Sequence, residues 1–267
     1  MLYVSNRGSE SVNVFAYPHG DLVRKLHFAA EPLLMCADNQ GNVFIPEGSA
    51  IVEYAYGGKK PLRTLSAGHY GGLDSCSFDA ATDGLAAASD LGYVAVFSLK
   101  RPFSPPVFYT TSYGALEFDD VTYDSGGNLF ATAYYAGSNF IFLELSKGSA
   151  VMKRVKVPYN FGEWGGLQWD GSYVAIEVET SSYGLVIDRL RIRNYKATVV
   201  GDVTLLGYEV GANQFWISDG TIVSATNGTT NLAFWKYPAG GEPWRTIKVA
   251  GLESDGIDGA VLTLATK

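Results

Sequence analysis

The sequence predicts an all-β fold, a six-bladed β-propeller built from four-stranded antiparallel blades, and three observations lead to this prediction. Short β-like runs recur with a period in the forties, one hairpin pattern occurs three times, and the end of the chain supplies a strand that its beginning lacks. A period in the forties is the length of a four-stranded propeller blade. We find no sustained helical periodicity, and we expect residues 1–267 to form one domain.

The repeat is marked by six apolar runs that each fit one strand. Their starting residues are spaced by 41, 42, 44, 44 and 49 positions. The runs are "MLYVSN" from Met1, "NVFIPEG" from Asn42, "GLAAASD" from Gly84, "NLFATAYY" from Asn128, "SYVAIEV" from Ser172 and "TIVSATN" from Thr221. An aspartate turn precedes most of them, and because a short carboxylate bonds the local backbone, we interpret these residues as turn formers: Asp38, Asp79, Asp124 and Asp170.

The repeated hairpin combines a tyrosine, a glycine-bearing turn and an arginine followed by leucine or isoleucine. Its copies are "AYPHGDLVRKL" from Ala16, "EYAYGGKKPLRTL" from Glu53 and "KYPAGGEPWRTI" from Lys236. Glycine supplies the positive φ that tight hairpin turns require. We therefore predict that each copy is the outer hairpin of a blade and carries structure rather than chemistry.

The two termini are predicted to complete one blade together. In the third repeat, twelve positions separate Gly72 from the run that begins at Gly84. Twelve positions after Gly256, in the tail "GIDGAVLTLATK", would be residue 268, where Met1 belongs if the chain closes on itself. The last strand then pairs in the first blade, which removes exposed sheet edges.

Composition and charge exclude several classes of protein. The 267 residues include 31 glycines, 47% are hydrophobic, and the net charge is −7 with an isoelectric point near 5.0. Nucleic acid is not an expected partner, because phosphate binding needs a basic stripe. No apolar run is long enough to span a membrane. We expect a monomer, and we predict that Cys36 and Cys76, which match neither a zinc set nor a disulfide framework, are two small buried thiols.

The cellular compartment stays open on the sequence alone. The chain begins directly in a strand pattern, and one N-x-T triplet occurs at Asn227. These features are compatible with a secreted or periplasmic protein whose signal peptide is absent from this sequence.

The alternation of strand direction segregates the charges of the loops onto two faces. The face with the turns between strands one and two and between strands three and four collects basic residues: Lys59, Lys60, Lys100, Arg101, Lys147, Lys196 and Lys267. The other face collects carboxylates, with Arg7 as the basic residue among them: Glu31, Glu47, Asp74, Asp90, Glu117, Asp119, Asp120, Glu163, Glu179, Glu209, Glu253, Asp255 and Asp258. We call the second set the acidic face and expect it to bind a cation, a cationic small molecule or a basic protein segment.

The carboxylates nearest the axis are the candidate metal ligands. They stand at the starts of the predicted innermost strands: Glu31, Asp74, Asp119, Asp120 and Asp258. Hard divalent ions such as Ca²⁺ take six to eight oxygen ligands, and clustered carboxylates repel one another unless a cation neutralises them. Asp119 and Asp120 are adjacent on one strand, so only one of them can point to the axis.

A histidine close to these carboxylates is the candidate catalytic base. His69 lies five residues before Asp74, and a neighbouring carboxylate can orient an imidazole for proton transfer. A surface residue without chemistry is the alternative. Aromatic residues near the same mouth could line a sugar- or amine-binding site or pack between blades: Tyr113, Tyr134, Tyr135 and Trp164.

The blade units resemble those of NHL-like and SMP-30 (gluconolactonase)-like six-bladed propellers. The resemblance rests on "LYVSNRGSESVNVFAYPHG" and "DNQGNVFIPEGSAIVEYAYGG" and extends over all six units. It implies the propeller fold and, for SMP-30-like enzymes, a metal that activates water and polarises a lactone carbonyl. Blades five and six offer "WGGLQ" and "VGANQ" where that pattern has metal-binding residues, which favours a binding module over the alternative, a metal-dependent lactonase or esterase.

Overall fold

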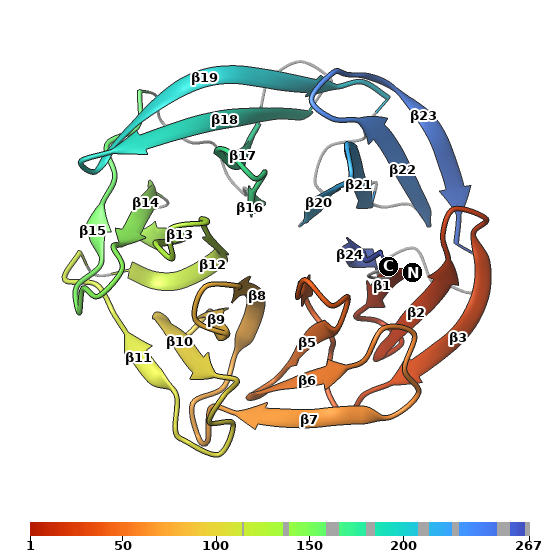
Figure 1. Cartoon of the computed structure of the whole chain (residues 1–267), viewed down its shortest axis with the longest axis horizontal. Coiled ribbons are helices and arrows are strands. Elements are labelled where there is room, and N and C mark those ends of the chain that lie inside the picture. The colour runs from red at the N-terminus through yellow and green to blue at the C-terminus, as the bar shows by residue number, and fades with distance from the viewer. Residues whose placement is uncertain are drawn as a thin grey trace.

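A computed structural model shows an all-β ring of radially arranged sheets around a central axis (Figure 1). The structure describes residues 1–113, 115–135, 139–158, 166–179, 185–207, 214–225, 230–249 and 257–264. Within these ranges, no helix has the length and apolar character that crossing a membrane requires.

The chain termini meet in one four-stranded sheet, in the order β24-β1-β2-β3. Its strands are β1 (Leu2–Asn6), β2 (Ser11–Ala16), β3 (Asp21–His27) and β24 (Ile257–Leu262). The last strand lies nearest the axis and pairs antiparallel with the first, with Leu2 opposite Leu262 and Tyr3 opposite Val261. The predicted closure of the first blade by the two terminal strands is therefore confirmed.

Three further sheets each contain four consecutive antiparallel strands. One consists of β4 (Cys36–Ala37), β5 (Val43–Glu47), β6 (Ala50–Tyr54) and β7 (Pro61–Ser66). The next consists of β8 (Leu73–Asp79), β9 (Gly84–Ser89), β10 (Tyr93–Ser98) and β11 (Val107–Tyr109). The third consists of β12 (Ala115–Tyr123), β13 (Leu129–Tyr135), β14 (Asn139–Leu145) and β15 (Lys153–Arg154).

The remaining strands form one eight-stranded sheet, in the order β16-β17-β18-β19-β23-β22-β21-β20. They are β16 (Leu167–Trp169), β17 (Val174–Glu179), β18 (Leu185–Arg193), β19 (Lys196–Leu205), β20 (Phe215–Ser218), β21 (Thr221–Ala225), β22 (Asn231–Lys236) and β23 (Gly240–Lys248). A single parallel pairing, Leu205 with Gly241, joins its two halves. The neighbouring Gly240 has a φ of 64°, and a Cβ there would lie 2.4 Å from the carbonyl oxygen of Thr204, so the contact between the halves requires glycine.

The six apolar runs that define the repeat all occupy the same place in the ring, the second strand from the axis. The six apolar runs form β1, β5, β9, β13, β17 and β21, each the second strand from the axis. The tyrosine–glycine–arginine pattern forms β2–β3, β6–β7 and β22–β23, which are outer hairpins, and Gly20, Gly57 and Gly240 supply positive φ in their turns. Both predictions are confirmed.

The core lies between neighbouring sheets, since each sheet packs its two faces against the next ones. The second strand from the axis is almost wholly buried, as in β9, whereas the outermost strands alternate between half-buried and exposed residues, as in β23. This follows from the pleat, which turns successive side chains to opposite faces. The strands nearest the axis, β4, β8, β12, β16, β20 and β24, are the ones whose side chains can face the central channel.

Candidate functional site

A cavity of about 660 Å³ occupies the central channel. Residues of all six innermost strands line it, and it extends to the turns that follow β4, β8 and β12. Among the described residues, its wall contains five aromatic side chains: Phe78, Tyr123, Trp169, Phe215 and Trp216. A concave site with apolar walls and a few convergent polar groups is the usual form of a small-molecule site.

Within the part of the chain that the structure describes, four aspartates line this cavity: Asp38, Asp79, Asp120 and Asp124. Among the described residues that line it there is no lysine, arginine or histidine. The cavity extends to the turns between the first and second strands, which lie on the face where the sequence predicted basic residues. Those residues, such as Lys147 and Lys196, belong to turns farther from the axis and do not line the channel. The wall of the cavity therefore carries carboxylates without a neutralising basic residue among its lining side chains.

Three of these aspartates are held by the turns that the sequence predicted. Asp38 Oδ1 accepts hydrogen bonds from the backbone N–H groups of Gln40 and Asn42, both at 2.8 Å, and Asp124 makes the same contacts with Gly126 and Asn128. Asp79 Oδ1 accepts from the N–H of Ala81 at 2.9 Å. Their role as turn formers is confirmed, as it is for Asp170, which accepts from Ser172 and Tyr173. The same turns fix three carboxylates around one mouth of the channel, a consequence that the repeat pattern alone did not indicate.

Asp120 is the buried member of the set. Its Oδ2 accepts a hydrogen bond from the N–H of Leu167 in β16 at 2.7 Å, and its Oδ1 accepts from the N–H of Val121 at 2.8 Å. Burial raises the pKa of Asp120 to about 8, against the opposing effect of these two N–H groups. The sequence predicted that only one of Asp119 and Asp120 points to the axis. Asp120 lines the cavity, and its carboxyl group also accepts a hydrogen bond from the backbone.

Replacing Asp120 by asparagine is expected to change the pH dependence of stability. The folded carboxyl keeps its proton up to about pH 8, whereas the unfolded one loses it near its ordinary pKa of 3.8. The free energy of unfolding should therefore fall as pH rises from about 4 to 8, by about 1.4 kcal/mol per pH unit for this group, and then level off. Urea denaturation from pH 4 to 9 measures this slope, which should be shallower in Asp120→Asn by about that amount. Equal slopes in parent and variant would contradict the assignment.

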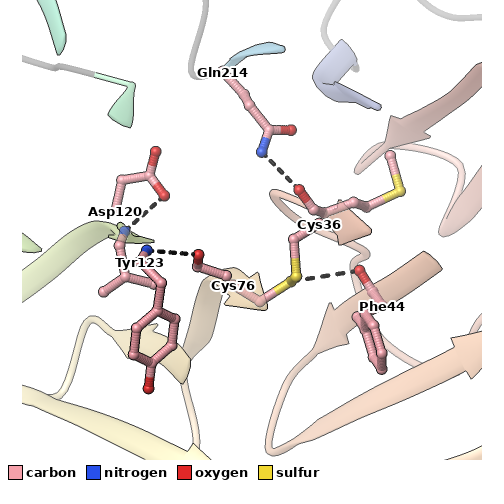
Figure 2. The surroundings of a disulfide bond; sticks show 9 residues. Cys36, Phe44, Cys76, Asp120, Tyr123 and Gln214 are labelled. Atoms are coloured by element: carbon pink, nitrogen blue, oxygen red, sulfur yellow. Dashed lines mark hydrogen bonds between the residues drawn. A yellow bond between two sulfur atoms is a disulfide. The ribbon is translucent and has the colours of Figure 1, made fainter. Parts of the chain in front are cut away.

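A disulfide bond between Cys36 and Cys76 lies beside the cavity, with a Cα–Cα distance of 5.5 Å (Figure 2). It joins β4 to β8, the innermost strands of neighbouring sheets. The prediction of two free thiols is wrong. The cysteines are 40 residues apart, which is close to one repeat, so they lie on the innermost strands of neighbouring sheets, where their side chains meet.

Two glutamines link inner strands across the channel wall. Gln214 Nε2 donates to the carbonyl oxygen of Met35 at 2.8 Å, and Figure 2 shows its side chain extending toward the backbone beside Cys36. It passes close to Gly259 of β24, where a Cβ would lie 2.5 Å from Oε1 of Gln214. Gln168 contacts both the N–H and the carbonyl of Ile217. Neither glutamine is among the site residues predicted from the sequence, although both stand at or beside inner strands in the two units that lack a carboxylate there.

The remaining predicted site residues do not line the cavity. They lie at or near the ends of the inner strands that are farther from the turns after β4, β8 and β12: Glu31, His69, Asp74, Asp119 and Asp258. Arg7 joins two of them, with its Nη2 3.1 Å from Oδ1 of Asp258 and its Nε 3.6 Å from Oε2 of Glu31. Burial raises the pKa of Asp74 to about 7, and repulsion from Asp90 and Asp119 adds to this shift. The structure thus brings Asp74 near Asp119 and joins Glu31 to Asp258 through Arg7.

Metal binding and catalysis at this end stay predictions. Among the described residues, no group of three or more His, Cys, Asp or Glu side chains is arranged to hold a metal ion. His69 is exposed, and its ring lies against that of Tyr70 with 4.4 Å between the centroids. Several predicted members of the acidic face and its mouth lie outside the described residues: Tyr135 with respect to its side chain, Glu163, Trp164, Glu179 with respect to its side chain, Glu209, Glu253 and Asp255. The N-x-T asparagine Asn227 and the terminal Lys267 lie outside them as well.

Comparison with known proteins supports the fold. No protein-family model matches the chain, and no curated protein matches it. A similar solved structure is the β-propeller domain of Cps50 (Swd1) from Myceliophteria thermophila, with a TM-score of 0.60 and 10% sequence identity over 92% of this chain and 82% of that one. At this identity the similarity shows the fold alone. The chain is a β-propeller with four-stranded antiparallel blades, and its terminal strands close the first blade.

Proposed function

We propose that this β-propeller is a binding module that takes a small organic cation into its central channel. The observation that carries the proposal is the lining of the cavity, which has four aspartates and five aromatic rings and, among the described residues, no basic side chain. The carboxylates of Asp38, Asp79 and Asp124 attract a cation through charge, whereas Asp120 keeps its proton up to about pH 8 and adds none at neutral pH. The faces of aromatic rings attract a cation through their quadrupole. The net charge of −7 favours the approach of such a ligand at low ionic strength.

The aromatic part of the wall supports an organic cation rather than a bare metal ion. Trp169 and Trp216 contribute large apolar surfaces, and the Trp216 Nε1–H already donates to the carbonyl of Leu262 at 3.0 Å. Hard metal ions prefer oxygen ligands throughout. A ligand with both methyl groups and a positive charge, such as a quaternary or tertiary amine, would use both kinds of surface.

Choline and its uncharged carbon analogue, 3,3-dimethylbutan-1-ol, test the proposal by isothermal titration calorimetry. We expect choline to bind and the neutral analogue of the same shape to bind at least tenfold more weakly, because only the charge differs. The double variant Asp79→Asn/Asp124→Asn should weaken choline binding by about tenfold and leave the neutral analogue unaffected. Asp83→Asn is the matched control, since Asp83 is half-exposed, pairs with Lys100 at 3.2 Å and does not line the cavity. Equal binding of choline and its neutral analogue would overturn the proposal.

A metal-dependent lactonase or esterase stays the alternative prediction. Among the described residues, however, no group of three or more His, Cys, Asp or Glu side chains is arranged to hold the metal ion that such an enzyme needs. Glu31 and Asp258 both contact Arg7, and Asp120 accepts two backbone N–H groups. We therefore derive no hydrolytic step from these residues. Calcium at millimolar concentration, compared with sodium at the same ionic strength, serves as an additional arm of the calorimetry, and heat specific to calcium would favour the alternative.

We infer that the eight-stranded sheet comprises two blades, β16–β19 and β20–β23, because a single pairing joins them and each half has its own strand beside the axis. This count gives six blades, as in the NHL-like and SMP-30-like propellers that the sequence resembles. We also infer an oxidising compartment, since disulfides form and persist there.

A further inference from the structure

We propose that an aromatic cluster on the sheet β8–β11 is a docking surface for an arginine-bearing segment of a partner protein. The cluster consists of His69, Tyr70, Tyr93 and Phe108. It lies on the acidic face, where the chain passes from β7 to β8 and turns from β9 to β10. It is separate from the cavity, which none of the four residues lines.

The rings of the cluster form a connected and partly exposed surface. Tyr70 stands at its centre, with its centroid 4.4 Å from His69, 4.6 Å from Phe108 and 5.7 Å from Tyr93. Tyr70 is 44% exposed although it makes all three contacts. Tyr93 is buried, and its hydroxyl donates to the carbonyl oxygen of Gly71 at 2.6 Å, which holds the loop that carries Tyr70. The exposed ring is therefore presented on a fixed support.

Carboxylates flank this ring surface. Asp90 lies against the loop, since a Cβ on Gly72 would meet its Oδ1 at 1.6 Å, and the Asp90 N–H donates to the Gly72 carbonyl at 3.1 Å. Asp74 and Asp90 both act electrostatically on Tyr93. Arg7 acts electrostatically on Asp74, and it already contacts Glu31 and Asp258. The cluster is thus an aromatic surface beside negative charge, complementary to a cation.

The geometry favours arginine over a compact ammonium group. A guanidinium is planar, stacks on aromatic faces and pairs with a carboxylate through two N–H groups at once. Tyr70 and Asp90 offer these two kinds of partner on one loop-and-turn surface.

A protein segment fits this surface better than a free small molecule does. The cluster is exposed at the surface, so a small ligand would leave much of its own surface in water, whereas small-molecule sites bury most of their ligand. Leu91 is 61% exposed in the turn that carries Asp90, and it offers apolar area to residues next to the arginine. An exposed aromatic and apolar patch with a charged rim is the usual anatomy of a protein interface.

The test uses the peptide acetyl-Gly-Arg-Gly-Arg-Gly-amide and its citrulline counterpart, each titrated into ¹⁵N-labelled protein. We expect the arginine peptide to shift the backbone amide signals of residues 69–72 and 90–93, and the citrulline peptide, which has the shape without the charge, to leave them in place. Tyr70→Ala and Asp90→Asn should each weaken binding about three- to fivefold. Phe103→Ala is the matched control, because Phe103 is a fully exposed aromatic residue in the connection between β10 and β11 of the same sheet.

Several outcomes would overturn this docking surface. They are equal shifts with the citrulline peptide, unchanged affinity in both Tyr70→Ala and Asp90→Asn, or peptide-induced shifts confined to residues that line the channel. Shifts that choline abolishes by competition would also place the arginine in the cavity and not on the cluster. The choline experiment tests residues of the channel, and the peptide experiment tests residues of the aromatic cluster. Either proposal can therefore fail while the other stands.

Discussion

Removing residues 257–267 is expected to abolish cooperative folding of the propeller. The deletion takes away β24, the strand beside the axis that pairs with β1. Ala260, Val261 and Leu262 are at most 2% exposed, and burying one large aliphatic side chain stabilises a protein by about 1.5–3 kcal/mol. The loss also bares the edge of β1 and the apolar faces packed against β24. The total is comparable with the whole stability of a typical domain, about 5–15 kcal/mol.

Differential scanning calorimetry of the truncated protein measures this effect. A shorter truncation that ends at Leu264 is the control, because it keeps β24 and the hydrogen bond from the Thr263 N–H to the carbonyl oxygen of Met1, at 2.8 Å. We expect the control to melt within a few degrees of the parent and the longer truncation to show no cooperative transition or to aggregate through its open edge. If the longer truncation melted like the parent, the ring would not depend on its terminal strand.

Loss of the disulfide is the second change with a large expected effect. The bond closes a loop of about 40 residues, for which the chain-entropy model gives about 4 kcal/mol of stabilisation. The double variant Cys36→Ala/Cys76→Ala should therefore unfold at a markedly lower urea concentration. Parent protein treated with a phosphine reductant should unfold at nearly the same concentration as the variant.

Thiol titration of the denatured parent provides the check on this assignment. Without reductant we expect no reactive thiol, and after reduction two, since Cys36 and Cys76 are the two cysteines of the chain. Two reactive thiols in the unreduced protein, together with stability that does not respond to reductant, would contradict the bond. A matched control is Ser77→Ala, which removes the hydrogen bond between Ser77 Oγ and the Tyr123 N–H but leaves the disulfide in place.

The repeat made most of the architecture predictable from the sequence. Strand positions recur with the blade period. The twelve positions that separate Gly72 from Gly84 also separate Gly256 from the place where Met1 would follow the last residue, so the pairing of β1 with β24 was predictable as well. Turn aspartates such as Asp38 and Asp124 were predictable because their hydrogen bonds are local. Arg7 was correctly expected to lie among carboxylates.

The disulfide and the cavity depend on contacts between blades, which local patterns do not show. Cys36 and Cys76 meet because β4 and β8 are neighbouring innermost strands, and their spacing of 40 residues was a usable signal for this. The position of the cavity depends on the sizes of side chains along the channel. Of the predicted site residues, Asp120 lines it, while Asp74 and His69 lie toward the acidic face. Gln214 gave no signal of its own, because its partner Met35 is 179 residues away.

A crystal structure of the protein with bound choline tests the central claim most directly. We predict ligand density in the central channel, in contact with the ring of Trp169 or Trp216 and near the carboxylates of Asp79 and Asp124. We also predict that the same crystals exposed to 3,3-dimethylbutan-1-ol at equal concentration show no density there. Choline density only at the acidic face or on the outer surface, or equal density for the neutral analogue in the channel, would contradict the claim that this channel is a site for organic cations.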